Sequence, residues 1–388
     1  MLCYLCFLCV LCHLYLLCDL CHLCDLCVKI MLHIFNPEHD IALAANSKHW
    51  TAPHAGRKLR ADLGWLPALW ASDGDIILVD DVEAAKNAVR KLKHPTANAA
   101  FVSLDNINKL DINNISPWGW DKAICQQLRC HGISDAILPS DDILNRQRQL
   151  SDRAVAARLL AAINNEMGDV CGEAVVAESF EQMTKQVMEW GSAVLKSPWS
   201  SSGRGVRFIN GIDELSSSSS NIVRWVDNVL RNQGHIMVER KLDKIKDFGM
   251  EFTALADGTV RYDGLSLFST VNGAYTGNIL ATEEEKQSML TRYLSLQLLA
   301  DVQQFICSWM QQEIRGAYVG PFGVDMMACA EKEKPTLNPC VEINLRRTMG
   351  HVALAISPCE PGKQLIMNIG YEGTGYHFRL HNDHELYY

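Results

Sequence analysis

The sequence lacks an excess of positive charge and, beyond its first 30 residues, any long apolar run. Its 36 Lys and Arg residues are outnumbered by 45 Asp and Glu residues, which gives a formal net charge of -9. A nucleic-acid-binding surface needs a basic footprint, and a membrane-spanning helix needs about 20 consecutive apolar residues. We therefore expect neither nucleic acid nor membrane among the partners of this chain.

Closely spaced cysteines are also missing from most of the chain. The cysteines after residue 30 are scattered singly, which is typical of a reduced cytoplasmic protein and not of a disulfide scaffold. The other cysteines crowd into residues 1–27 on a three-residue spacing that matches neither a helix nor a strand. A metal-binding tract and a membrane or targeting segment are alternatives for this head. We expect translation to begin at Met31 and segment 1–30 to lie outside the native protein.

The segment 31–137 alternates strand-like and helix-like patterns. Buried-strand patterns at 32–36 and 73–81 are followed by polar turns, and amphipathic helix patterns cover 82–93 and 122–132. This alternation predicts a small parallel α/β domain, in which ligands bind at the carboxyl ends of the strands. The residues after the first strand are therefore substrate candidates, with turn shaping and helix capping as the alternative for the first and last: Asn36, Glu38, His39 and Asp40.

A second domain is expected over 138–388. Ser140 or Asp141 and Ser151 or Asp152 mark two helix starts at its entrance. Strands and helices then alternate over about 170–240, which we expect to form a nucleotide-flap subdomain. Further elements are expected in the rest of the chain: strands near 250–257 and 259–269, a loop at 272–278, one long helix over about 284–315, and two strands joined by a polar turn at 331–338.

The stretch SAVLKSPWSSSGRGV, residues 192–206, joins an apolar run to a loop of serines and glycines. Lys196 ends the predicted strand, and the loop glycines allow backbone amides to approach phosphate oxygens closely. Arg204 and Arg207 add positive charge. Many Ser/Gly loops are only hairpin turns, so the loop alone leaves phosphate binding open.

Two strands near the C-terminal end carry hard oxygen ligands. Glu342 and Asn344 are two residues apart and therefore lie on one face of their strand. The hairpin turn lets Asp325 on the preceding strand face the same cleft. Oxygen ligands of this kind suit Mg²⁺, and the apolar surroundings disfavour the alternative of solvated acidic residues. Arg346 follows directly, where an arginine can stabilise charge on a transferring phosphoryl group.

The order of these motifs resembles the ATP-grasp superfamily, which includes D-alanine ligases, biotin carboxylases and carbamoyl-phosphate synthetases. The resemblance rests on the strand lysine, the glycine-rich loop, VERKL, GMEFTALADG, and VD followed by EIN. It covers roughly residues 138–355, and 31–137 resembles the family's N-terminal α/β domain. It implies an α/β protein with an α+β ATP-grasp domain after a small parallel α/β domain. It also implies ATP and Mg²⁺ as cofactors, with Mn²⁺ as an alternative metal.

The resemblance further implies roles for single residues. Lys196 and Arg346 would be catalytic, and Asp325, Glu342 and Asn344 would bind the metal. Arg153 replaces a lysine expected near the domain entrance. Its guanidinium would bind phosphate through two parallel N–H donors, where lysine would act as a point charge. Asp243 or Asp247 would contact the ribose. The expected nucleotide-binding residues are Arg153, Lys196, Ser200, Ser201, Ser202, Gly203, Arg204, Gly205, Glu239, Arg240, Leu242 and Glu251.

Most ATP-grasp members join a carboxylate to an amine or thiol through an acyl phosphate. We therefore predict an ATP- and magnesium-dependent ligase acting on small-molecule or peptide carboxylates and amines. Tyr275 and Asn278 are further substrate candidates, on the acceptor side facing the N-terminal domain. A small-molecule phosphotransferase and a nucleotide-binding module without turnover are the alternatives. The sequence also admits homo-oligomers.

Overall fold

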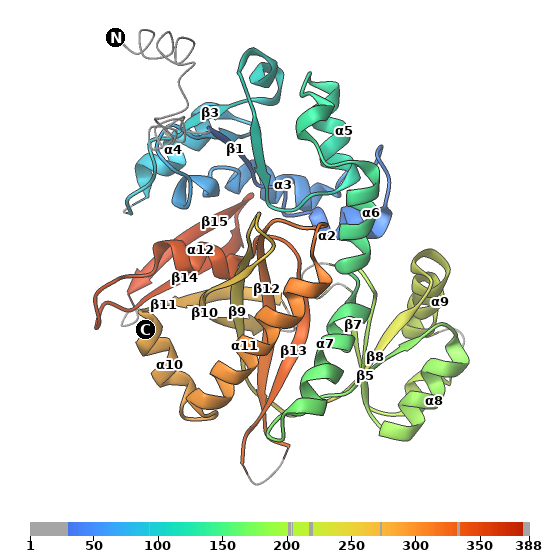
Figure 1. Cartoon of the computed structure of the whole chain (residues 1–388). Helices are drawn as coiled ribbons and strands as arrows, with labels where there is room; N and C mark the ends of the chain where they lie inside the picture. The colour runs from blue at the N-terminus through green and yellow to red at the C-terminus, as the bar shows by residue number, and fades with distance from the viewer. Residues whose placement is uncertain are drawn as a thin grey trace, which may run out of the picture.

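A computed structural model describes residues 30–382, except 93, 201–202, 204, 217–219, 272–273 and 332–333. Nearly all of the predicted head, residues 1–29, lies outside this range. The described strands form three sheets, seen in Figure 1 as an upper α/β part, a large central sheet and a small sheet beside α8 and α9. Within the described residues, no helix is long and apolar enough to cross a membrane.

The N-terminal sheet is parallel, as the alternating pattern predicts. Its strands run in the order β3-β2-β1-β4 and comprise β1 (Met31–Ile34), β2 (Ile76–Leu78), β3 (Ala100–Val102) and β4 (Asn114–Pro117). Side chains of Asp81 and Asp121 cap two of the accompanying helices. These helices are α2 (His39–Ala45), α3 (His54–Leu63), α4 (Val82–Lys91) and α5 (Lys122–Cys130).

Two helices lead from this domain into the rest of the chain, and both predicted helix starts are confirmed. Ser140 caps α6 (Asp141–Leu150) by accepting from Ile143 N, and Asp152 caps α7 (Arg153–Glu166) by accepting from Ala154 N. Arg153 is thereby fixed as the first residue of α7, directly behind its cap.

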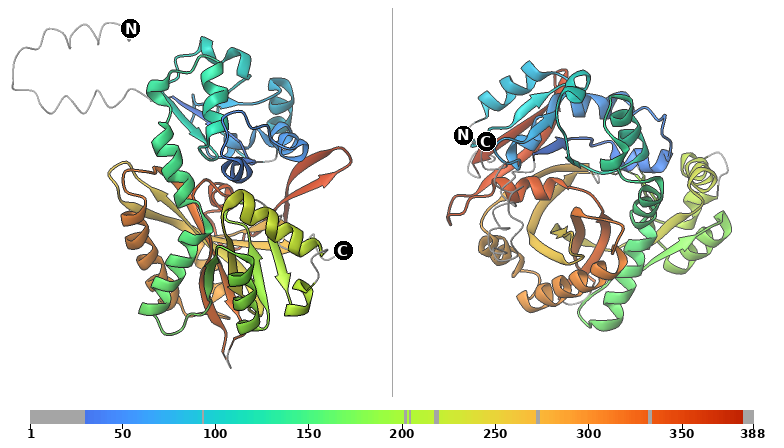
Figure 2. Two further views of the ribbon diagram at one scale, coloured as in Figure 1. Left: turned by 90° about the vertical axis from the view of Figure 1, so that its right-hand side faces the viewer. Right: turned by 45° about the horizontal axis from the view of Figure 1, so that its top comes forward.

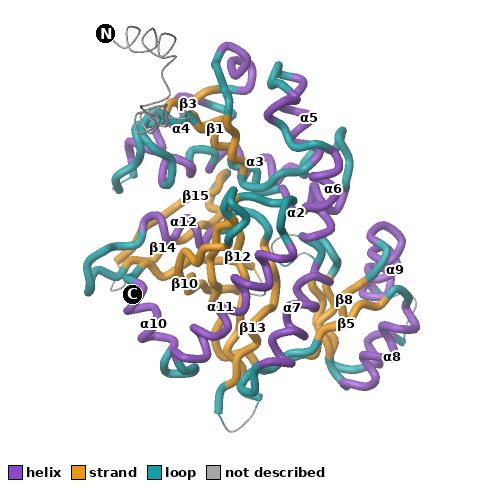
Figure 3. The backbone as a smooth tube through the Cα atoms, viewed as in Figure 1, coloured by secondary structure: helices purple, strands orange, loops and turns teal. Residues whose placement is uncertain are grey.

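The small sheet is antiparallel, with strand order β5-β8-β6-β7. Its strands are β5 (Ala174–Ala177), β6 (Ala193–Lys196), β7 (Val206–Ile209) and β8 (Ile236–Arg240). Helices α8 (Phe180–Trp190) and α9 (Asn221–Gln233) lie on the side away from the large sheet (Figure 3). Met183 and Val187 of α8 are fully buried in the core of this part.

The large sheet has the strand order β13-β12-β9-β10-β11-β14-β15. Helices α7 and α11 (Leu296–Glu313) pack in one core with its central strands, and α12 (Met349–Ile356) packs in another. The strands are β9 (Lys244–Ala254), β10 (Val260–Val271), β11 (Ala274–Leu280), β12 (Gly320–Cys329), β13 (Thr336–Asn344), β14 (Leu365–Glu372) and β15 (Gly375–Asn382).

Several sequence expectations for this part were wrong in detail. The segment expected as a loop at 272–278 is mostly strand β11, because it pairs with both β10 and β14. The single long helix is two helices, α10 (Glu283–Leu290) and α11, because Ser295 caps a new helix start. Strand β13 begins at Thr336, so the polar turn is shorter than expected. The terminal hairpin β14–β15 was not predicted.

The N-terminal domain and the large sheet share one hydrophobic core. Phe35, Leu63 and Trp65 are packed in the same cluster as Val352 of α12 and Met367 of β14. The rings of Trp65 and Phe378 meet edge to face at 5.6 Å, and Tyr376 N donates to Asp62 Oδ2 at 2.8 Å. The hairpin β14–β15 therefore fastens the large sheet to α3, and the two views of Figure 2 show it beside the N-terminal domain.

Candidate active site

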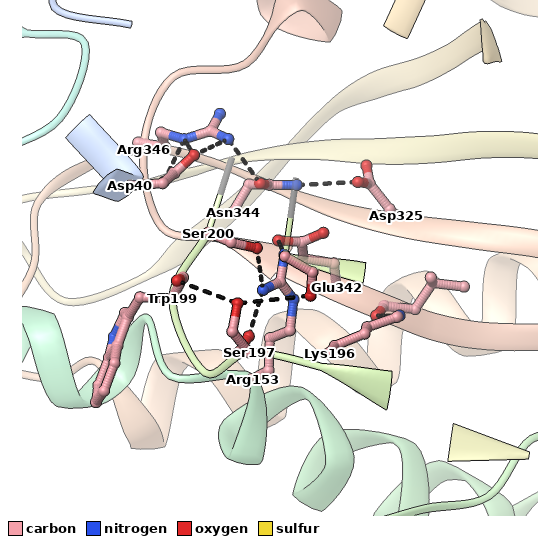
Figure 4. A network of polar contacts seen from close by, with 12 residues as sticks. Asp40, Arg153, Lys196, Ser197, Trp199, Ser200, Asp325, Glu342, Asn344 and Arg346 are labelled. Atoms are coloured by element: carbon pink, nitrogen blue, oxygen red, sulfur yellow. Dashed lines mark hydrogen bonds and ion pairs between the residues drawn. The ribbon is translucent and has the colours of Figure 1, made fainter. Parts of the chain in front are cut away.

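Strands β12 and β13 bring the predicted metal ligands to one cavity. Asp325 and Glu342 are register partners across the two strands, and Asn344 Nδ2 donates to Asp325 Oδ2 at 3.1 Å (Figure 4). All three line a cavity of about 180 Å³. The antiparallel pairing and the two-residue spacing on β13 put these oxygens on the same side of the sheet.

The charge in this cavity suits a divalent cation. Burial, with repulsion from Glu342, raises the pKa of Asp325 to about 7, so its ionisation is disfavoured without a cation. Asp325 Oδ1 and Glu342 Oε2 accept no hydrogen bond from the described residues. The described part of the chain contains no group of three His, Cys, Asp or Glu able to hold a metal. The oxygens of Asp325, Glu342 and Asn344 fit Mg²⁺ that completes its shell with phosphate oxygens.

Arg153 joins the glycine-rich loop to this carboxylate wall. Its Nη1 donates to Ser197 O at 2.5 Å and to Ser200 Oγ at 2.8 Å, and its Nη2 lies 2.6 Å from Glu342 Oε1. The side chain is 6% exposed. A Cβ at Gly205 would lie 2.2 Å from the hydroxyl oxygens of both serines, so the loop needs glycine there. The guanidinium thus binds a loop carbonyl, a loop hydroxyl and an acid, and the last two belong to residues that line the cavity.

Lys196 reaches from the small sheet to the large one. Its Nζ lies 2.7 Å from Glu239 Oε2 and donates to Val341 O at 3.2 Å, next to Glu342. The lysine is buried at the end of β6. The structure therefore places a cation from the small sheet beside the acidic strand of the large sheet, with Glu239 as its counterion.

The other predicted nucleotide residues are less uniform. Arg240 pairs with Glu173 at 3.3 Å and with Glu331 at 3.2 Å, so its side chain links the segment before β5 to the turn after β12. Leu242 lies half-buried just after β8. Asp247 pairs with Lys244 at 2.6 Å. Gly203 lines the cavity, whereas three predicted loop residues lie outside the described residues: Ser201, Ser202 and Arg204.

Glu251 of β9 also lines the cavity and is 2% exposed. Its Oε2 accepts from Thr348 Oγ1 at 2.8 Å and lies 3.0 Å from His351 Nδ1. Burial raises the pKa of Glu251 to about 8, and burial lowers the pKa of His351 to about 3. A Cβ at Gly350 would lie 1.8 Å from Glu251 Oε1, so only glycine leaves room for this carboxyl group.

Thr348, Gly350 and His351 were missed by the sequence reasoning. Thr348 caps α12, and His351 completes a capping box at its third position. That capping pattern was the available signal, although it predicts a helix start and not contact with Glu251. The contact arises because α12 begins directly behind β9.

Tyr275 and Asn278 lie on strand β11 and line the same cavity. Tyr275 Oη donates to Asn278 Oδ1 at 2.6 Å, and Asn278 Nδ2 donates to Ser266 Oγ at 2.8 Å. Burial raises the pKa of Tyr275, so the phenol remains a donor. These groups line the cavity together with Asp325 and Glu342.

Three of the four predicted substrate residues after β1 have internal partners. Asn36 Nδ2 donates to Gly119 O at 2.8 Å, and His39 Nδ1 lies 3.2 Å from Asp121 Oδ2. Glu38 Oε1 lies 2.6 Å from Arg60 Nη1. Asn36 and Glu38 line a different cavity, of about 350 Å³, within the N-terminal domain. His39 is packed against Gly119.

Asp40 is different, because it crosses to the large sheet. Arg346 Nε donates to its Oδ1 at 2.9 Å, and Arg346 Nη2 donates to its Oδ2 at 2.7 Å (Figure 4). The same Nη2 donates to Asn344 Oδ1 at 2.9 Å. Burial raises the pKa of Asp40, but the Arg346 guanidinium outweighs burial and holds that pKa below its usual range. Asp40 and Arg346 both line the cavity.

The chain is similar in structure to the biotin carboxylase domain of Hydrogenobacter thermophilus 2-oxoglutarate carboxylase, which was crystallised with magnesium-ADP, ADP and bicarbonate. The identity is 14% and the TM-score 0.51, over 88% of this chain and 74% of that one. Rhizobium etli pyruvate carboxylase shows 15% identity and a TM-score of 0.50, over 88% and 31%. Staphylococcus aureus N5-carboxyaminoimidazole synthetase with ADP shows 13% identity and a TM-score of 0.47, over 88% and 82%.

No family model and no curated protein matches the sequence. The likeness to the two carboxylases, at low identity, is a likeness of fold over most of the chain. The chain has the ATP-grasp fold, as the order of its sequence motifs predicts.

Proposed function

We propose that this protein is an ATP- and magnesium-dependent ligase that joins a carboxylate to an amine or thiol through an acyl phosphate. The observation that carries the proposal is the pairing of a cationic edge with an acidic wall. Arg153 and Lys196 both reach the strand of Glu342, where Asp325 and Asn344 lie beside it. An anionic triphosphate with a divalent cation matches this arrangement of charges.

Lys196, Arg153 and the loop containing Ser200 and Gly203 would bind the phosphates of ATP. Arg153 already donates to Ser200 and would exchange its contact with Glu342 for phosphate oxygens when the nucleotide binds. Asp325, Glu342 and Asn344 would hold Mg²⁺, which neutralises charge on the phosphates. Glu239 and Leu242 lie at the junction of the small and large sheets, where they would contact the base.

Arg346 would receive the carboxylate substrate, because it is a fork-shaped donor that lines the cavity beside the metal ligands. Asp40 and Asn344 hold its guanidinium in a fixed plane. Glu251, Tyr275 and Asn278 would face the acceptor. The amine must lose a proton to attack the activated carbonyl, and the carboxylate of Glu251 can accept one once it is ionised.

The seven described cysteines are free thiols, which supports the proposed cytoplasmic location. The acceptor and donor are expected to be small molecules or peptide ends, because the cavity measures only about 180 Å³.

An ADP-release screen of the full chain against pooled carboxylates and amines tests this function. We expect ADP and phosphate to appear only when both substrates are present, and Lys196→Ala to abolish the release. Hydroxylamine should trap the acyl phosphate as a hydroxamate when the amine is omitted. Transfer of phosphate to one stable acceptor without ligation would instead identify a phosphotransferase, and would overturn the proposal.

A further inference from the structure

Two cysteines come together beside Thr336, at the base of the small sheet. Cys171 precedes β5, and Cys329 is the last residue of β12. Cys171 is half-buried and Cys329 is fully buried. Thr336 Oγ1 also donates to Cys171 Sγ at 3.3 Å. Thr336 is the register partner of Cys329 across β12 and β13, so three elements converge on this thiol pair.

The backbone around Cys171 holds the pair in place. Cys171 N donates to Leu337 O at 2.8 Å, and Val170 forms a parallel bridge with Leu337. Gly172 follows with a φ of +107°, a conformation that favours glycine. The chain therefore turns sharply from a segment fixed to β13 into the first strand of the small sheet.

This junction also touches the segment expected to contact the nucleotide base. Glu173 O accepts from Arg240 N at 2.9 Å, and Arg240 pairs with Glu331, two residues after Cys329. The two chain crossings between the small and large sheets, near 171 and near 240, thus lie side by side. A covalent bond at the first crossing would restrict both.

Cys171 differs from the comparable thiol of Cys307. Both are half-buried, and burial raises the pKa of Cys307. Interaction with the Cys329 thiol, aided by the hydrogen bond from Thr336, lowers the pKa of Cys171 despite its burial, while the same interaction raises the pKa of Cys329. The thiolate is the nucleophile in thiol–disulfide exchange, so Cys171 is the attacking member of the pair.

We propose that Cys171 and Cys329 form a reversible modification site, oxidised to a disulfide by a low-molecular-weight disulfide such as oxidised glutathione. The Cys171 thiolate attacks one sulfur of the oxidant and releases the first small thiol, which takes up the proton. Cys329 then loses its proton and attacks Cys171 Sγ, expelling the second small thiol. Two protein thiols are oxidised to one disulfide, and one small disulfide is reduced to two thiols.

The disulfide would fasten the base of the small sheet to β12, the strand that also carries Asp325. Closure of a lid over bound substrate commonly limits turnover. The small sheet would act as such a lid, so fixing its base to β12 should slow turnover. This consequence rests on the proposed ATP-dependent function, whereas formation of the disulfide does not.

The test is peptide mapping by mass spectrometry of the full chain after incubation with oxidised glutathione. We expect one dominant cross-link between the peptides of Cys171 and Cys329, reversed by reductant. Cys171→Ser and Cys329→Ser should each abolish it, and the matched Cys307→Ser should not. Before oxidation, Cys171 should be alkylated by iodoacetamide faster than Cys307, although both are half-buried.

Cys171 joined instead to a cysteine of residues 1–27, or a stable glutathione adduct without the Cys329 bond, would overturn the proposal. ATP turnover is then measured on the same samples. If the disulfide forms and turnover is lost only in the oxidised wild type and in Cys307→Ser, the site regulates the enzyme. If the disulfide forms and no ATP use is found in any sample, the proposed ligase function fails while the modification site stands.

Discussion

Two clusters of polar residues follow strands in this molecule, and they have opposite fates. The turn after β1 carries Asn36, Glu38, His39 and Asp40. The first three side chains pair with other residues of the N-terminal domain and not with the central cavity. Strand β13 carries Glu342 and Asn344 at its end, Arg346 follows two residues later, and all three line the central cavity. The two clusters are joined by one ion pair, between Asp40 and Arg346.

The difference follows from backbone geometry. In a strand, residues two apart face the same side, so the spacing of Glu342 and Asn344 fixes a common direction. Arg346 lies just beyond β13 and is held to it by donating from Nη2 to Asn344 Oδ1. In a turn that leads into a helix, successive side chains point in different directions. Each therefore forms hydrogen bonds or ion pairs with different nearby residues. Polar residues at a strand end are therefore stronger candidates for function when they belong to the strand than when they follow it.

The largest expected effect is at the acidic wall. Glu342→Gln should lower ATP turnover by about 100-fold or more, because a ligand charge for the metal is lost. Steady-state kinetics with varied Mg²⁺ would measure it. Glu313→Gln is the matched control, since Glu313 is also paired with an arginine, at 2.8 Å, and its side chain is 22% exposed against 28% for Glu342. Equal activity of both variants would contradict the metal assignment.

Loss of the ion pair between Asp40 and Arg346 should give the next largest effect on activity. Asp40→Asn removes the charge that orients Arg346, and we expect kcat/KM for the carboxylate substrate to fall about tenfold. The Kd for ATP, measured by isothermal titration, should change little. Asp80→Asn, an exposed acid in the same domain, is the control. A loss of ATP affinity as large as the loss of kcat/KM would contradict a role confined to the carboxylate.

The pH dependence of that link sharpens the comparison. Because Arg346 holds the pKa of Asp40 below its ordinary value of 3.8, the pair stabilises the fold above that value. The stability advantage of wild type over Asp40→Asn should therefore be constant near neutral pH. It should shrink as the pH falls below 3.8 through the folded pKa. Urea unfolding at a series of pH values would measure it, and a difference that vanished near neutral pH would contradict the ion pair.

The smallest effect on activity is expected in the turn. Asn36→Ala should cost about 1–3 kcal/mol of stability, because it leaves buried partners such as Gly119 O without a donor. Turnover per folded molecule should stay close to wild type. Thermal unfolding and active-site titration would separate the two, with the exposed Asn113→Ala as control. A specific loss of kcat would show that the turn acts directly on substrate.

The sequence predicted the parts of the site that depend on local pattern. Neighbouring residues are enough to predict the alternation of β13, the position of Lys196 at a strand end and the helix start at Arg153. The contacts of Glu251 with Thr348 and of Asp40 with Arg346 join residues 97 and 306 positions apart. No local pattern encodes such pairs. Strand β11 was predicted as a loop for the same reason. It is a strand because it pairs with β10 and β14, and its own sequence does not indicate this pairing.

The hairpin β14–β15 has a consequence for any attempt to divide the protein. Residues Trp65 and Leu63 share their hydrophobic packing with Val352 and Met367, so a fragment ending near residue 137 would expose a surface that is normally covered. Cutting at the boundary read from the sequence should yield an insoluble or molten N-terminal piece. Calorimetry of the intact chain should show these two parts melting together in a single cooperative transition, with the small sheet free to melt apart from them.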